Sequence, residues 1–96
     1  MIVNEDEIEF LVDSSFDFSL TLTIIFSAKE SLFKALYPYI GRYFDFSAAS
    51  IIDFSNNNQS FELRLNQSLS KELVKGSRFK GYFSVESNHV LTLIAM

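Results

Sequence analysis

The stretch Phe16–Phe26 reads FDFSLTLTIIF and decides the predicted fold. Apolar residues occupy every second position, and Asp, Ser and Thr stand between most of them. Successive side chains of a β-strand point to opposite faces, so this spacing gives one apolar face and one mostly polar face. Burial of the apolar face contributes on the order of 10 kcal/mol before conformational entropy is subtracted. The pattern therefore predicts a long amphipathic strand against which the rest of the chain packs.

Length and composition indicate a single domain over residues 1–96. Apolar residues make up 48% and aromatic residues 16% of the chain, which is too hydrophobic for a disordered segment. The absence of Cys excludes disulfides, thiolate metal sites and a Cys nucleophile. The chain begins with acidic residues where a secretory signal needs positive charge, and no apolar run approaches the roughly 20 residues of a membrane span. A cytoplasmic location is expected.

The spacing of the apolar residues changes after Phe26. Ser27 and Glu30 have the spacing of a capping box, which predicts a helix that begins there and ends near Pro38. Further strands are predicted at residues 7–12, 43–46, 50–54, 60–66, 78–86 and 90–96, with a turn at 56–58 and a second short helix at 68–75. The expected fold is α+β, with a single antiparallel sheet of about five to seven strands and two short helices.

Charge and aromatic residues together predict a surface that binds a partner. The net charge is −4, and residues 1–17 hold six acidic side chains and no basic one. Such an edge steers association with a basic protein. The core of a small domain is too limited for fifteen aromatic residues, and exposed Tyr and Phe are typical anchors of interfaces. The predicted partner-binding residues are Glu5, Asp6, Glu7, Glu9, Tyr37, Tyr39 and Tyr43.

The sequence offers little for catalysis. His89 is the only His and lies in a predicted turn, and the chain has neither a Gly-x-Ser-x-Gly turn nor a glycine-rich phosphate loop. No spacing places two carboxylates in one cleft. We therefore predict no catalytic, cofactor-binding or metal-binding residues, and a protein that is not an enzyme.

Two short segments are similar to motifs of known families. Residues 45–50 (Asp-Phe-Ser-Ala-Ala-Ser) are similar to the Asp-x-Ser-x-x-Gly turn of PilZ cyclic-dinucleotide domains, but Ser50 replaces the Gly and no Arg-x-x-x-Arg clamp precedes it. Residues 80–85 resemble the aromatic strand of the RNA recognition motif, but Phe83 and Ser84 depart from its pattern. An acidic chain also lacks the charge that nucleic acid requires.

The predicted function is a small acidic, non-enzymatic protein-binding module. Its most concrete form is an inhibitor of a basic or nucleic-acid-handling partner, of the immunity-protein or anti-CRISPR type. Two alternatives remain open. One is a self-associating subunit that forms a homodimer through the apolar residues 90–96, and the other is a small-ligand sensor of the cyclic-dinucleotide kind. No cofactor, nucleic acid or membrane is expected as a partner.

Overall fold

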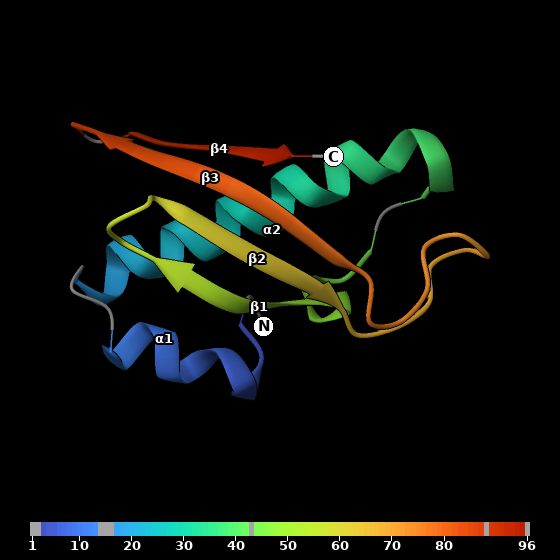
Figure 1. The fold of residues 1–96 in the computed structure, drawn as a ribbon, viewed down its shortest axis with the longest axis horizontal. Coiled ribbons are helices and arrows are strands. Elements are labelled where there is room, and N and C mark those ends of the chain that lie inside the picture. Colours follow the sequence, from blue (N-terminus) through green and yellow to red (C-terminus); the bar gives the residue numbers. More distant parts are fainter. Residues whose placement is uncertain (1–2, 14–16, 43, 88, 96) are drawn as a thin grey trace.

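The computed structural model describes residues 3–13, 17–42, 44–87 and 89–95, and its fold is α+β (Figure 1). In chain order the elements are η1 (Glu5–Glu7), α1 (Ile8–Asp13), α2 (Phe18–Ile40), η2 (Phe46–Ala48), β1 (Ala49–Ser55), β2 (Ser60–Leu65), β3 (Arg78–Glu86) and β4 (His89–Ala95). The four strands of the described chain form one antiparallel sheet in the order β1-β2-β3-β4.

The predicted long strand is wrong, because residues 18–26 form the first part of α2. Asp17 caps this helix, and its Oδ1 accepts a hydrogen bond of 2.7 Å from the backbone N–H of Leu20. The residues of α2 that are buried recur at intervals of three and four: Thr21, Ile24, Ile25, Ala28, Lys29, Leu32, Phe33 and Leu36. The helical period, not the local alternation, determines which side chains are buried. Phe18 therefore lies on the surface with 59% of its area exposed. Phe16 lies outside the described residues.

The predicted start of the first helix is also wrong, whereas its predicted end near Pro38 lies close to the last helical residue, Ile40. Ser27 does not cap a helix but lies in the middle of α2. Pro38 lies in the last turn, where its missing N–H costs one hydrogen bond of a helix that is already ending. The helix stops at Gly41, whose φ of 78° is left-handed and whose N–H donates to the carbonyl of Tyr37 at 2.8 Å.

The other predicted elements are partly wrong and partly confirmed. Residues 7–12 are not a strand, since they belong to η1 and α1, and residues 68–75 are not helical in the structure. Of residues 43–46, Tyr43 lies outside the described residues and Phe46 begins η2. The expected five to seven strands and two short helices are therefore wrong: the described chain has four strands, and α2 is its one helix of seven or more residues. The turn at 56–58 and the strands near 50–54, 60–66, 78–86 and 90–96 are confirmed.

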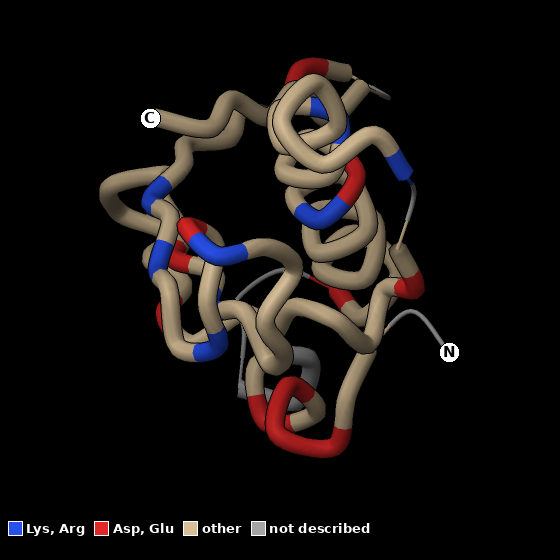
Figure 2. Tube along the Cα trace, turned by 90° about the vertical axis from the view of Figure 1, so that its right-hand side faces the viewer, with Lys and Arg blue, Asp and Glu red and all other residues tan. Residues whose placement is uncertain are grey.

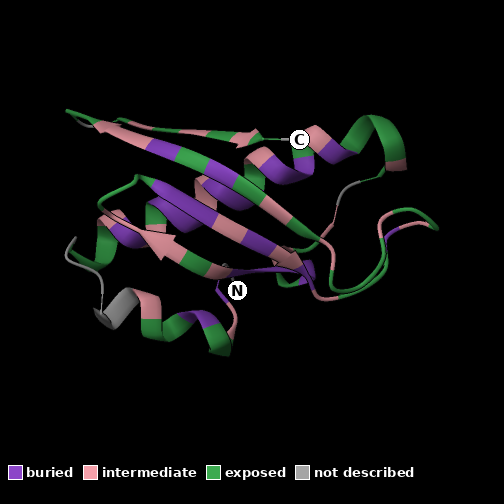
Figure 3. Cartoon of the chain, viewed as in Figure 1, coloured by how far each residue is buried: buried purple, intermediate pink, exposed green. Residues whose placement is uncertain are grey.

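The core lies between α2 and one face of the sheet. In Figure 1 α2 crosses behind the strands, and Figure 3 shows buried positions concentrated on α2 and the central strands. The buried apolar residues that the strands contribute are Ala49, Ile51, Phe61, Leu63, Leu65 and Phe83. In β4 exposed and half-buried residues alternate, and Leu91 and Leu93 point away from α2 with 60% and 67% of their areas exposed.

The N-terminal segment is joined to the open edge of β1. The side-chain amide of Asn4 donates to the carbonyl of Ala49 at 3.1 Å and to the hydroxyl of Ser50 at 2.8 Å. The carboxylate of Glu7 accepts from the backbone N–H of Ile51 at 2.5 Å. These contacts satisfy part of an edge that would otherwise invite pairing with another strand. Among the helices of the described ranges, none combines the length and the apolar character needed to cross a membrane.

Candidate functional site

A pocket of about 190 Å³ lies between α2 and the segment that leads into η2. Its lining residues are Glu30, Phe33, Lys34, Phe44 and Phe46. Three of them come from consecutive turns of α2, and two come from the connection between α2 and the sheet. The pocket therefore brings together a helix face and a loop that are about ten residues apart in the chain.

The charged side chains of this pocket are available for a ligand. Glu30 and Lys34 are four residues apart, so they lie one above the other on the exposed side of α2. Within the described ranges neither of them takes part in an ion pair or a side-chain hydrogen bond. Arg42 adds a second cation, with its guanidinium carbon 4.9 Å from the centroid of the Phe44 ring. Glu30 and Lys34 therefore line the pocket with one charge of each sign, and the second cation, Arg42, lies against the ring of Phe44.

The apolar surface is a wall of aromatic rings with a defined geometry. Phe33 and Phe46 are stacked, with centroids 5.9 Å apart and an interplanar angle of 14°. Phe44 lies 6.1 Å from Phe33, and Phe26 meets the edge of Phe46 at 5.1 Å. Such pairs stabilise their arrangement by about 0.5–1.5 kcal/mol each beyond simple burial. The wall thus presents an apolar surface beside the charged groups.

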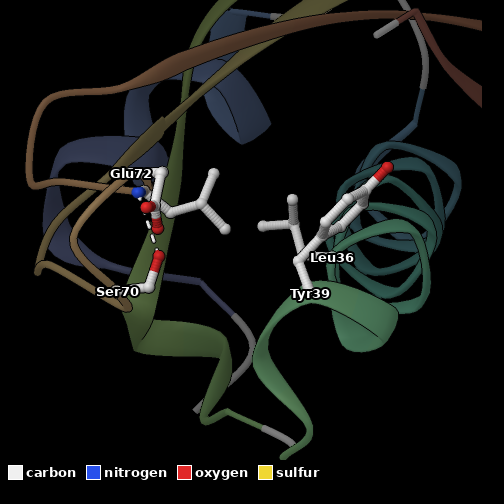
Figure 4. A pocket seen from close by; sticks show the side chains of 5 residues that line it. Leu36, Tyr39, Ser70 and Glu72 are labelled. Carbon is white, nitrogen blue, oxygen red and sulfur yellow. Dashed lines mark hydrogen bonds between the residues drawn. The ribbon is translucent and has the colours of Figure 1, made fainter.

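A larger pocket of about 380 Å³ lies at the end of α2 and is mostly apolar. Figure 4 shows Leu36, on α2, facing Ser70 and Glu72 across it. The hydroxyl of Ser70 already accepts a hydrogen bond of 3.1 Å from the backbone N–H of Leu73, and Glu72 is the only charged residue of the described lining. With no cation among these lining residues, this pocket is a poorer candidate for an anionic ligand than the pocket at Glu30 and Lys34.

The structure separates the residues predicted to bind a partner. Figure 2 shows acidic positions gathered at the end of the molecule where η1 and α1 lie. Glu5, Asp6 and Glu9 are exposed there, whereas Glu7 is completely buried and cannot pair with another protein. Tyr37 and Tyr39 have 39% and 74% of their areas exposed, and Tyr43 lies outside the described residues. That the exposed members bind a partner stays a prediction.

No cluster of three or more His, Asp or Glu side chains within the described part of the chain is placed to hold a metal ion. Among the described residues that line the 190 Å³ pocket, Glu30 is the one carboxylate. His89 lies at the start of β4 and is exposed, far along the chain from this pocket.

The fold and this pocket define a small α+β domain with an exposed carboxylate and an exposed ammonium group on one helix face beside aromatic rings. A family model for the 4'-phosphopantetheinyl transferase superfamily matches residues 1–94, and the chain belongs to this superfamily. No match to the chain was found among curated proteins. The family is one of transferases, so the prediction of a non-enzymatic inhibitor or adaptor of the immunity-protein type is wrong. The small-ligand sensor and the self-associating structural subunit are overturned as functions by the same match.

Sequence reasoning missed Glu30 and Lys34 as site residues. Glu30 was assigned to a helix cap, and Lys34 carried no prediction. The signal was present, because a Glu and a Lys four residues apart share one face of any continuous helix. The helix predicted from Ser27 to about Pro38 already contains both positions, so the pair could be found from the sequence.

Proposed function

We propose that this protein transfers a 4'-phosphopantetheinyl group to an acceptor hydroxyl, and that the pocket at Glu30 and Lys34 binds the reacting phosphate. The observation that carries the proposal is the placement of an exposed carboxylate and an exposed ammonium group on one helix face of a chain that belongs to a transferase superfamily. The donor of this chemical class is coenzyme A, in which a pyrophosphate joins pantetheine to adenosine 3'-phosphate, and the transferred group carries one of the two phosphates.

The charges of the pocket match the chemistry of the transfer. The acceptor oxygen forms a bond to the phosphorus next to the pantetheine arm. The bond from this phosphorus to the bridging oxygen breaks, and adenosine bisphosphate leaves. Lys34 and Arg42 bind phosphate oxygens, because cations stabilise the charge that builds up on a transferring phosphoryl group. Glu30 accepts the proton of the acceptor hydroxyl as a general base.

The aromatic wall has a separate role. Phe33, Phe44 and Phe46 give the donor an apolar surface beside the charged groups and exclude water from one side of the phosphate. Electrostatic interactions are stronger where water is excluded, so the wall strengthens the contacts of Lys34 and Glu30 with the reacting groups.

The test is a transfer assay with coenzyme A as donor and a carrier protein with an unmodified acceptor serine, followed by mass spectrometry of the acceptor. Lys34→Met removes a charge-assisted contact, so the KM for coenzyme A rises by about 10- to 100-fold. Glu30→Gln removes the base, so kcat falls by about 100-fold or more. Both variants keep the helix, since Met and Gln are good helix formers.

Matched controls come from exposed residues that are not among those lining the pocket. Lys71→Met and Glu86→Gln make the same chemical changes on the loop and at the end of β3, and both retain the activity of the wild type. The proposal fails if no acceptor gains mass with the wild-type protein. It also fails if Lys34→Met and Glu30→Gln transfer the group as well as the controls do.

A further inference from the structure

Lys29 and Glu7 form an ion pair that the proposed transfer does not use. Both side chains are completely buried, and the distance from Lys29 Nζ to Glu7 Oε1 is 2.7 Å. Lys29 immediately precedes Glu30, which is exposed in the pocket. Burying two charges is costly unless their geometry and hydrogen bonds are excellent, so an ion pair at this place needs a reason.

The pair connects segments that are far apart in the chain. Glu7 Oε1 also accepts from the backbone N–H of Asn4 at 2.7 Å, and Glu7 Oε2 accepts from the backbone N–H of Ile51. Lys29 Nζ donates a second hydrogen bond to the carbonyl of Phe46 at 3.1 Å. One buried pair thus holds η1, α2, the start of η2 and β1 against one another.

Two of the segments that this pair joins, α2 and the start of η2, carry residues that line the pocket. The carbonyl that Lys29 binds belongs to Phe46, whose ring lines the pocket and stacks on Phe33. Phe33 itself lies one helical turn after Lys29, and Glu30 is the next residue. Lys29 therefore fixes both the helix face that carries Glu30 and the loop that completes the aromatic wall.

We propose that Lys29, through its buried pair with Glu7, is a positioning residue for the transfer rather than a ligand of the donor. This inference rests on the proposed function. The side chain has no exposed area, and its ammonium group is bound to Glu7 and to the Phe46 carbonyl. Lys34, five residues further on, is the lysine of this helix that lines the pocket.

The closing experiment compares Lys29→Met, Glu7→Gln and the double variant in the transfer assay. Positioning through the pair predicts that Glu7→Gln and Lys29→Met lower kcat to a similar extent. A displacement of about 1 Å at a reacting group can cost about 100-fold. The KM for coenzyme A changes by less than about threefold, because Lys34 still binds the phosphate. The double variant is no worse than either single variant, since both remove the same connection.

The double variant also guards against loss of folding. Removing one partner of a buried ion pair leaves an uncompensated charge, whereas removing both charges together leaves none. The double variant therefore folds, as judged by circular dichroism, even where Lys29→Met alone does not. Its kcat remains low, because the Phe46 carbonyl has lost the ammonium group that held it. Lys71→Met, on the exposed loop, is the matched control and keeps the wild-type kcat and KM.

A readout besides activity separates this inference from the proposed function. Stacking on Phe33 shifts the aromatic proton resonances of Phe46, and these resonances move in Glu7→Gln and in the double variant but not in Lys71→Met. If they stay in place, Lys29 does not position the wall, whether or not transfer is detected. The inference is also overturned if Glu7→Gln keeps the wild-type kcat while Lys29→Met raises the KM for coenzyme A, since Lys29 would then be a donor ligand. A folded double variant that keeps the wild-type kcat would also overturn the inference.

Discussion

Replacing Gly81 with Ala tests how closely the sheet is packed. Gly81 is buried in β3 and lies opposite Phe61 of β2 and Ile94 of β4. A Cβ at this position would overlap the ring of Phe61 and would lie 2.7 Å from the carbonyl oxygen of Leu93. The ring is 2% exposed, and the oxygen belongs to the backbone of a paired strand, so neither can move away at low cost.

The magnitude follows from two opposing effects. Forcing an extra carbon into a packed core costs typically 1–3 kcal/mol, whereas Ala in place of Gly stabilises by roughly 0.4–1 kcal/mol through the unfolded chain. We expect the free energy of unfolding of Gly81→Ala to fall by about 1–2 kcal/mol, which lowers the Tm by several degrees in a domain of this size.

Urea denaturation followed by circular dichroism measures this change, and a second substitution tests its cause. Phe61→Leu removes the ring, so Gly81→Ala costs less in a chain that already carries Phe61→Leu than in the wild type. The contact with the Leu93 carbonyl persists, so the rescue is partial. Equal or greater stability of Gly81→Ala than of the wild type would refute the close approach of β2 and β3 at this point.

Two further predictions concern the start of α2 and the surface charges. Asp17→Ala removes the side chain that accepts from the N–H of Leu20, so the free energy of unfolding falls by about 1 kcal/mol in urea, and Asp17→Asn largely restores it. Arg64→Met breaks the half-exposed pair with Asp6, in which N and O are 3.3 Å apart, so stability falls by less than about 1 kcal/mol and the difference shrinks in high salt. A larger, salt-independent loss for Arg64→Met would mean that this pair is more than a surface contact.

Apart from the helix wrongly predicted at 68–75, the second half of the chain could be predicted from its sequence because the signals of its strands and turn are local. Phe61, Leu63 and Leu65 alternate with polar residues, and all three are buried in β2. The Asn residues at 56–58 mark the turn that joins β1 and β2. Pairing with the adjacent strand satisfies the backbone over the same residues, so pattern and fold agree.

The prediction for the first half of the chain is wrong because a strand-like alternation and a helical repeat of apolar residues overlap there. Residues 18–26 alternate as a strand does, but Ile24, Ala28, Leu32 and Leu36 repeat every four residues and continue for three turns beyond. A helix of 23 residues buries the longer pattern against the sheet and leaves Phe18 exposed. Local alternation loses because the total area buried along α2 is larger.

The candidate site could not be found by counting charges, because burial gives similar residues different roles. Glu5, Glu7 and Glu9 look alike in the sequence, yet Glu7 is fully buried and paired with Lys29 while the other two face solvent. Lys29 and Lys34 differ in the same way, one inside the core and one at the pocket. The acidic residues of the N-terminal segment therefore have two roles. Glu5 and Glu9 lie on the surface, and Glu7 binds Lys29 of the helix that carries Glu30. The prediction of a single acidic binding edge assigned Glu7 to a partner, although Glu7 is buried against Lys29. It also left Glu30 and Lys34, which line the pocket, without a role.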